Sequence, residues 1–247
     1  MNAIEVENLS KRFGPLYALR DITFELKEKE TLGLVGDNGA GKSTLIKTLC
    51  GIHQPTTGVI RIFGKAYDFL TPDIATKIGI AAVHQEYPLV PQRSVVENFF
   101  IGNEIKRDGI LGKLGILDLK KMRNETYEAL KRMGINVNVN KPAGTLSGGE
   151  KQITAIARAL YRNPKILLLD EPTTALSVVV EERFIEFLKQ LKDKYSIIYI
   201  SHNLRRVIEI SDRIMVLRQG RIVDILDNQS KDLDPLFLSK LFLGVAK

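Results

Sequence analysis

The sequence predicts an α/β protein whose core carries a mainly parallel sheet, with an N-terminal antiparallel β subdomain and an inserted helical subdomain. Three observations lead to this prediction. Apolar and polar residues alternate near the N-terminus, short apolar strands alternate with helices later on, and residues 86–162 have helical spacing with almost no β-branched runs. We therefore expect a single domain over residues 1–247, with its core in 1–85 and 163–247 and a helical subdomain at about 86–162.

Each core element has its own signal. Alternation at Ile4, Val6 and Leu9, and again from Ile22 to Leu26, predicts two half-buried antiparallel strands. A glycine-rich stretch then follows a compact apolar strand and precedes a helix that ends at Gly51. The expected strands cover residues 31–35, 59–63, 78–83, 165–169 and 196–200, with a hairpin of 214–217 and 221–226, and the expected helices cover 42–50, 180–193 and 204–210.

Composition excludes several classes of protein. Apolar residues make up 44% of the 247-residue chain and charged residues 26%, which is ordinary for a globular protein. The net charge, 36 − 29 = +7, permits a nucleic-acid or anionic-membrane partner without requiring one. A single cysteine, Cys50, allows no intrachain disulfide and is expected to pack in the core. We expect neither a signal peptide nor a membrane-spanning helix, since no apolar run approaches about 20 residues.

A phosphate-binding loop joins the strand at 31–35 to the helix at 42–50. Its sequence fits G-x-x-x-x-G-K-[ST], in which glycines let backbone N–H groups surround phosphates and the helix N-terminus adds its positive end. This motif predicts a P-loop NTPase core, with Lys42 reaching the β- and γ-phosphates and the Ser43 hydroxyl binding Mg²⁺. The expected nucleotide contacts are Gly36, Asp37, Asn38, Gly39, Ala40, Gly41, Lys42, Ser43 and Thr44.

The nucleotide is expected to be ATP rather than GTP. GTPases read guanine with an N-K-x-D element, and the single Asn-Lys pair here, Asn140-Lys141, is followed by Pro142 and Ala143.

Two acids end the apolar strand at 165–169. Asp170 is expected to hold Mg²⁺, directly or through water, and Glu171 to orient or deprotonate the attacking water. Apolar strands also end in acids that only cap the next helix. The phosphate loop in the same chain is what favours a catalytic interpretation of these two acids.

A second anion-binding motif lies at residues 146–152. Ser147, Gly148 and Gly149 precede a helix, and a serine hydroxyl, two glycines and a helix N-terminus suit a phosphate. Ser147 and Glu150 also fit the S-x-x-E capping box. Both interpretations can hold at once.

The L-S-G-G-E sequence at 146–150, between a phosphate loop and an acidic strand end, resembles the ATP-binding cassette (ABC) family. The resemblance covers nearly the whole chain, and it implies ATP and Mg²⁺ as ligands. Phe13 resembles the aromatic residue that stacks on adenine. Gln85 resembles the glutamine that binds Mg²⁺ and senses the transporter, and His202 resembles the histidine that contacts the γ-phosphate, which makes Glu171, His202 and Lys42 the expected catalytic residues.

One branch of the family is especially similar. The segments from Val83 to Glu86 and from Ser94 to Asn98, and the sequence at 172–177, resemble ATPases of importers for monosaccharides such as ribose, xylose and galactose. The chain departs from most of the family at Ser177, where aspartate is usual, and it has one cassette where members of this branch often have two.

The resemblance implies an importer motor. Two copies would dimerise head to tail and sandwich two ATP molecules, each between the phosphate loop of one copy and the 146–150 motif of the other. Separate membrane permease subunits and an extracytoplasmic substrate-binding protein are the implied partners, which locates the chain at the cytoplasmic face of the membrane, or in the cytoplasm when isolated. We expect the permease to contact a groove near residues 87–90, and Phe99 and Phe100 to be core.

Two alternatives belong to other classes. A soluble ABC ATPase that acts on DNA or ribosomes is compatible with the +7 charge, but no sustained heptads, charged linker or basic helix with interleaved aromatics is present, so we expect no nucleic-acid partner. A regulatory cassette that does not hydrolyse ATP is disfavoured because Lys42, Asp170, Glu171 and His202 are all present.

Overall fold

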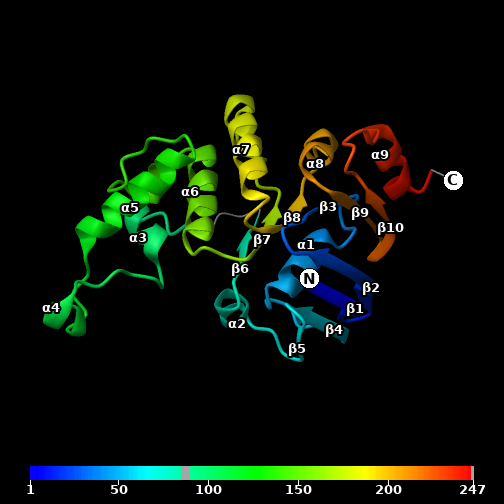
Figure 1. Ribbon diagram of the computed structural model, residues 1–247, viewed down its shortest axis with the longest axis horizontal. Coiled ribbons are helices and arrows are strands. Elements are labelled where there is room, and N and C mark those ends of the chain that lie inside the picture. Colours follow the sequence, from blue (N-terminus) through cyan, green and yellow to red (C-terminus); the bar gives the residue numbers. More distant parts are fainter. Residues whose placement is uncertain (85–88, 246–247) are drawn as a thin grey trace. The chain divides into compact units, whose positions relative to one another are not determined.

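The computed structural model describes residues 1–84 and 89–245. Within them the chain forms two compact units. The core unit comprises residues 1–84, 163–172 and 188–247, and the helical unit comprises 85–162 and 173–187. Figure 1 shows the strands in the core unit and helices α3, α5 and α6 in the helical unit.

The core unit contains two sheets. The first is antiparallel, has the strand order β2-β1-β4-β5, and consists of β1 (Asn2–Phe13), β2 (Leu16–Lys27), β4 (Thr57–Ile62) and β5 (Lys65–Tyr67). The second has the order β10-β9-β3-β8-β7-β6 and consists of β3 (Thr31–Val35), β6 (Ile80–Val83), β7 (Ile166–Asp170), β8 (Ser196–Ile200), β9 (Arg213–Arg218) and β10 (Arg221–Asp227). All its neighbours pair in parallel except β9 and β10. The predicted fold class is confirmed.

Burial explains the two kinds of strand sequence. Every residue of β3, β7 and β8 is buried, and these strands are apolar apart from the end residues Thr31, Asp170 and Ser196, as expected for strands covered on both faces. Strands β1 and β2 alternate because one face packs on the core while the other is exposed. Cys50 is buried in this core, and burial raises the pKa of its thiol to about 12, which fits the predicted packing role.

The helices divide between the units. The core unit contains α1 (Lys42–Leu49), α2 (Pro72–Lys77), α8 (Leu204–Ile210) and α9 (Pro235–Leu243), and the helical unit contains α3 (Val95–Phe100), α4 (Gly109–Lys113), α5 (Leu119–Arg132), a 3-10 turn (Ala143–Thr145) and α6 (Gly148–Tyr161). Helix α7 (Val178–Leu191) begins in the helical unit and ends in the core unit. No helix within residues 1–84 and 89–245 combines the length and the apolar character that a membrane span needs.

The helical unit has its own apolar core. Phe99 and Phe100 are 1% and 0% exposed, and each packs edge-on against Tyr161, with ring centroids 5.2 and 5.1 Å from that of Tyr161. Their predicted core role is confirmed. Residues 173–187 also group with this unit, although the sequence pattern predicts them in the core. One contact that joins these residues to the helical unit is a hydrogen bond in which the Ala175 N–H donates to Oε1 of Gln152 in α6 at 3.1 Å.

Candidate functional site

Three chain segments meet at one edge of the six-stranded sheet. Strands β3, β8 and β7 are neighbours and run in the same direction, so the residues after them emerge at the same edge. The glycine-rich loop follows β3, Glu171 follows β7, and His202 comes shortly after β8. The core unit thus brings together residues that lie up to 166 positions apart, from Gly36 to His202.

The phosphate loop needs glycine at two of its positions. Gly36 has φ of 156°, and a Cβ there would lie 2.2 Å from the Leu217 carbonyl oxygen. Gly41, the residue that caps α1, has φ of 107°, and its Cβ would lie 2.6 Å from the Ala18 carbonyl oxygen. Both are close backbone approaches that no side chain tolerates, and they hold the loop against β2 and β9.

The first turn of α1 offers N–H groups to a ligand. The first intrahelical bond runs from the Leu45 N–H to the Gly41 carbonyl at 2.9 Å, so the N–H groups of Lys42, Ser43 and Thr44 have no acceptor inside the helix. Such groups bind anions together with the positive end of the helix. The Ser43 side chain is exposed beside them.

The Lys42 ammonium lies over the same loop. Its Nζ donates to the carbonyl oxygens of Gly36 at 2.6 Å and of Asp37 at 3.0 Å, and the residue is only 8% exposed. Burial lowers the pKa of Lys42 from its ordinary value of 10.5, while the charges of Glu171 and Asp170 act in the opposite direction. The charge is therefore held close to the anion-binding N–H groups.

Asp170 ends β7 in the same region, and Glu171 follows it directly. Asp170 is 4% exposed and Glu171 is 7% exposed. Glu171 has φ of 53°, in the left-handed region, and its N–H donates to the Ile200 carbonyl of the neighbouring strand β8 at 3.1 Å. Its Oε1 lies 3.4 Å from Nε2 of His202. The pairing of β7 with β8 thus places a carboxylate beside an imidazole whose side chain is 60% exposed.

The environment of Glu171 makes its carboxylate more basic. Burial raises the pKa of Glu171 above its ordinary value of 4.5, and the Asp170 charge adds to the increase, whereas His202 and Lys42 oppose it. A buried carboxylate with a raised pKa is suited to accept a proton.

The same raised pKa makes Glu171 a source of instability at high pH. Between its ordinary and its raised pKa the folded state binds more protons than the unfolded state, so stability falls as the pH rises through that window. We expect Glu171→Gln, which is neutral throughout, to melt above the wild type at pH 8, where the wild-type carboxylate is charged and buried. The difference should shrink as the pH falls toward 4.5.

Calorimetry of the nucleotide-free protein across pH measures this difference. Glu128→Gln, which changes an exposed carboxylate of α5, is the matched control and should behave like the wild type. Equal melting temperatures for Glu171→Gln and the wild type at pH 8 would count against the buried, destabilising charge.

The 146–150 motif lies in the helical unit at the start of α6. Ser147 is the N-cap, and its Oγ accepts from the Glu150 N–H at 3.3 Å while a Glu150 carboxylate oxygen accepts from the Ser147 N–H at 2.7 Å. The capping box is confirmed. Ser147 and Gly148 are exposed, and a Cβ on Gly149 would lie 3.3 Å from the Ala175 carbonyl oxygen. An exposed helix N-terminus with small residues is compatible with the anion-binding interpretation.

Phe13 ends β1 in an aromatic and cationic setting that its sequence neighbours alone do not indicate. The Phe13 side chain is 43% exposed, and its ring centroid lies 5.2 Å from that of His53 at an interplanar angle of 78°. The Lys11 ammonium lies 5.0 Å from the same centroid and donates to the Gln54 carbonyl at 2.7 Å. Lys11 could have been anticipated, because residues two apart on a strand share a face, but His53 lies far along the chain.

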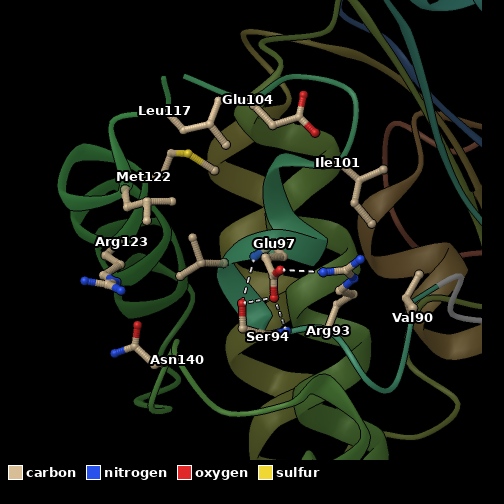
Figure 2. Close-up of a pocket in the computed structure, with 12 residues that line it drawn as sticks. Val90, Arg93, Ser94, Glu97, Ile101, Glu104, Leu117, Met122, Arg123 and Asn140 are labelled. Atoms are coloured by element: carbon tan, nitrogen blue, oxygen red, sulfur yellow. Dashed lines mark hydrogen bonds and ion pairs between the residues drawn. The ribbon is translucent and has the colours of Figure 1, made fainter. Parts of the chain in front are cut away.

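Gln85 and Tyr87 lie outside the described residues. Pro88 also lies outside them, so of the groove expected near 87–90 only two residues are described: Leu89 is half-buried and Val90 is 42% exposed. Val90 stands at the edge of a cavity of about 580 Å³ within the helical unit, shown in Figure 2. Glu97 bonds there to the Ser94 hydroxyl at 2.7 Å and to Arg93 at 3.1 Å, and the remaining lining residues are Val96, Ile101, Glu104, Leu117, Leu119, Met122, Arg123 and Asn140.

Comparison with known families gives one broad match. Residues 19–174 match the protein family described as "ABC transporter". This stretch contains the phosphate loop, the 146–150 motif and the acidic end of β7.

Curated relatives give a narrower likeness. The chain is 41% identical over 222 residues to "Ribose import ATP-binding protein RbsA" of Bacillus licheniformis, and 41% identical over 224 residues to "Ribose import ATP-binding protein RbsA 2" of Escherichia coli O157:H7. These alignments cover 90% of this chain but 44% and 43% of the relatives. The chain therefore spans less than half the length of the curated relatives it matches.

Solved structures resemble the whole chain. A dimeric post-hydrolysis state of the ATP-binding cassette MJ0796, bound to ADP and Pi, matches with a TM-score of 0.79 and 29% identity over 91% of this chain and 98% of that one. A nucleotide-free ATP-binding cassette from an ABC transporter matches with a TM-score of 0.82 and 25% identity over 98% of this chain and 99% of that one.

Proposed function

The chain belongs to the ABC transporter family, and from this premise we propose that it is the ATP-hydrolysing motor subunit of an importer for a simple sugar. The observation that carries the proposal is the juxtaposition, at one sheet edge, of an anion-binding loop with Lys42 and a buried carboxylate at Glu171. The name of the curated relatives, which are ribose import ATP-binding proteins, supports the sugar as cargo.

The loop and Lys42 would bind the ATP phosphates. In the free chain the Lys42 ammonium is hydrogen-bonded to loop carbonyls, and phosphate oxygens are stronger acceptors for the same donor. The first-turn N–H groups of α1 supply further donors, and Phe13, with its exposed ring, would stack on the adenine.

The donors near the phosphates fit Mg²⁺. Within residues 1–84 and 89–245 no three His, Cys, Asp or Glu side chains cluster in a way that could hold a metal, so a site made by protein carboxylates alone is not available there. Mg²⁺ suits such a place, because it binds through one carboxylate, hydroxyl and phosphate oxygens, and water. Ser43 and Asp170 would hold it, together with Gln85, and it would neutralise charge on the β- and γ-phosphates.

Glu171 would act as the general base. Its carboxylate takes a proton from water as the water oxygen bonds to the γ-phosphorus, and the bond from that phosphorus to the bridging oxygen breaks with its electron pair leaving on ADP. His202, whose Nε2 is 3.4 Å from Glu171, would orient the carboxylate and contact the γ-phosphate.

A single chain would not form the complete site. The 146–150 motif belongs to the helical unit, and in this proposal Ser147, Gly148 and Gly149 close the ATP held by a second copy of the chain. The dimeric state of the similar cassette MJ0796 supports this arrangement.

The permease subunits would dock at the cavity of the helical unit. Exposed Val90 and Ile101, each 42% exposed, give it apolar contacts, and Arg93, Glu97 and Arg123 give it polar ones. The chain would then lie peripherally at the cytoplasmic face of the membrane, and a substrate-binding protein outside the membrane would deliver the sugar.

Serine at Val90 and Ile101 tests this function. We expect Val90→Ser combined with Ile101→Ser to leave the ATPase of the free protein near normal but to weaken co-purification with the permease subunits at least tenfold, since apolar anchors commonly contribute about 2 kcal/mol. Val223→Ser, a change at an exposed residue of β10, is the control.

The outcome separates the candidate functions. Recovery of nucleic acid or ribosomes in place of membrane subunits would overturn the importer assignment. Parallel loss of ATPase and thermal stability in the double variant would make Val90 and Ile101 structural residues only.

A further inference from the structure

A protruding segment of the helical unit has no role in the function proposed above, apart from Leu117 and Leu119 at its end, which line the cavity. Residues 106–119, here called the α4 tip, lie between α3 and α5 and contain the five-residue helix α4. Figure 1 shows α4 at the outer end of this loop, away from α6.

The base of the α4 tip is firmly closed. The Arg107 N–H donates to the Ile116 carbonyl at 2.9 Å, and the Asp118 N–H donates to the Ile105 carbonyl at 2.8 Å. Ile105 and Leu117 pack against the core of the helical unit. The backbone is also tightly folded, because a Cβ on Gly112 would lie 1.7 Å from the Arg107 carbonyl oxygen.

The closed tip presents aliphatic side chains to solvent. Helix α4 has no buried residue, although a helix this short has little stability of its own. Five large aliphatic residues are exposed over this short stretch: Ile110 (76%), Leu114 (71%), Leu119 (48%), Leu111 (43%) and Ile116 (42%). Clusters of this kind mark interaction sites rather than random surface.

Positive charges surround these aliphatic residues. The tip itself contains three cations (Lys106, Arg107 and Lys113) and two acids, 3 − 2 = +1, and Lys120 and Lys121 follow it directly in α5, which brings residues 106–121 to 5 − 2 = +3. Asp118 is engaged as the N-cap of α5, where it accepts from the Lys121 N–H at 2.9 Å. In the described part of the chain, the one ion pair among these cations is that of Lys121 with Glu125, at 4.0 Å.

Charge decides between the possible occupants. A second copy of the tip would bring the same positive charges together, which disfavours self-association. Aliphatic side chains flanked by lysine and arginine match the interface of an anionic bilayer, where the aliphatic groups enter the headgroup boundary and the cations bind lipid phosphates.

We propose that the α4 tip binds directly to the surface of an anionic lipid bilayer, with Ile110 and Leu114 inserted and Lys106 and Lys113 on the headgroup phosphates. This contact needs neither nucleotide nor permease, so it goes beyond the proposed import function and can fail or succeed independently of it.

Co-sedimentation with vesicles tests the proposal. The vesicles are phosphatidylcholine with about 30% phosphatidylglycerol, which gives them a negative surface. We expect the full chain to bind them at least tenfold more tightly than vesicles of pure phosphatidylcholine. Lys106→Gln with Lys113→Gln should weaken that binding about 25-fold, because each basic residue near such a surface contributes about fivefold. Ile110→Ser with Leu114→Ser should weaken it at least tenfold.

Matched variants keep the test specific. Lys27→Gln with Lys240→Gln removes two exposed lysines outside the tip, and Val223→Ser removes an exposed aliphatic residue, and both should bind like the wild type. Circular dichroism and ATPase activity should be unchanged in all variants. Absence of wild-type binding, or equal losses in tip and control variants, would overturn the proposal. Unchanged vesicle binding together with lost permease binding in the tip variants would make the tip a protein contact and also overturn it.

Discussion

Replacement of Glu171 by glutamine is expected to lower ATP turnover by about 10²–10⁴-fold while ATP affinity changes little. Glutamine keeps the shape of the side chain and the N–H bond to Ile200, but it cannot take a proton from water. Lys42 and the first-turn N–H groups of α1, which we propose as the phosphate ligands, are untouched by the change.

Single-turnover kinetics and equilibrium ATP binding measure the two effects separately. Glu128→Gln, at an exposed position of α5, is the control and should turn over ATP like the wild type. Turnover of the Glu171→Gln protein at the wild-type rate would remove Glu171 from its proposed role. A loss of affinity equal to the loss of turnover would mean that the residue supports the fold of the phosphate site rather than the chemical step.

Substitution of Ser147 is expected to abolish hydrolysis without affecting ATP binding by the monomer. In the proposed dimer this residue faces the ATP bound by the other copy, so Ser147→Arg would block the interface. Because Ser147 is also the N-cap of α6, arginine there costs about 0.5–2 kcal/mol of stability. Ser147→Asp separates the two roles, since aspartate caps as well as serine but repels the phosphates.

Mixing two inactive variants tests the composite site. Ser147→Arg protein keeps an intact phosphate loop, and Lys42→Ala protein keeps an intact 146–150 motif. With Glu171→Gln added to both so that ATP is not consumed, we expect ATP-driven dimers in the mixture but in neither protein alone. Loss of ATP binding by the Ser147→Arg monomer would mean that the motif acts within its own chain.

The sequence predicted the parallel sheet and the phosphate loop because both depend on local patterns. Strand β7 has four consecutive apolar residues before Asp170, and the loop has fixed spacing between its glycines and Lys42. The contact between Glu171 and His202 depends instead on which strands are neighbours, and the sequence spacing does not contain that information. The packing of His53 on Phe13 could not be predicted for the same reason, because it depends on which distant segments are neighbours in the fold.

Some elements were missed or shifted for local reasons. Helix α9 was not predicted, because its residues are apolar with almost no periodic stripe. Helix α2 was also missed, although Thr71 caps it and Pro72 begins it, two signals that short helices share with turns. Helix α7 was predicted two residues late, because Val178 and Val179 favour strands, whereas the Glu181 N–H bonds to the Ser177 carbonyl at 2.8 Å and starts the helix earlier.

The central claim is that two copies of this chain enclose ATP between the phosphate loop of one and the 146–150 motif of the other. The mass of the Glu171→Gln protein with and without ATP tests this claim most directly. Light scattering measures that mass while a filter assay counts bound nucleotide. The account predicts a 27.7 kDa monomer without ATP and, with Mg²⁺ and ATP, a species of twice that mass that retains one ATP per chain. A protein that binds one ATP per chain and stays at the monomer mass over all accessible concentrations would contradict it.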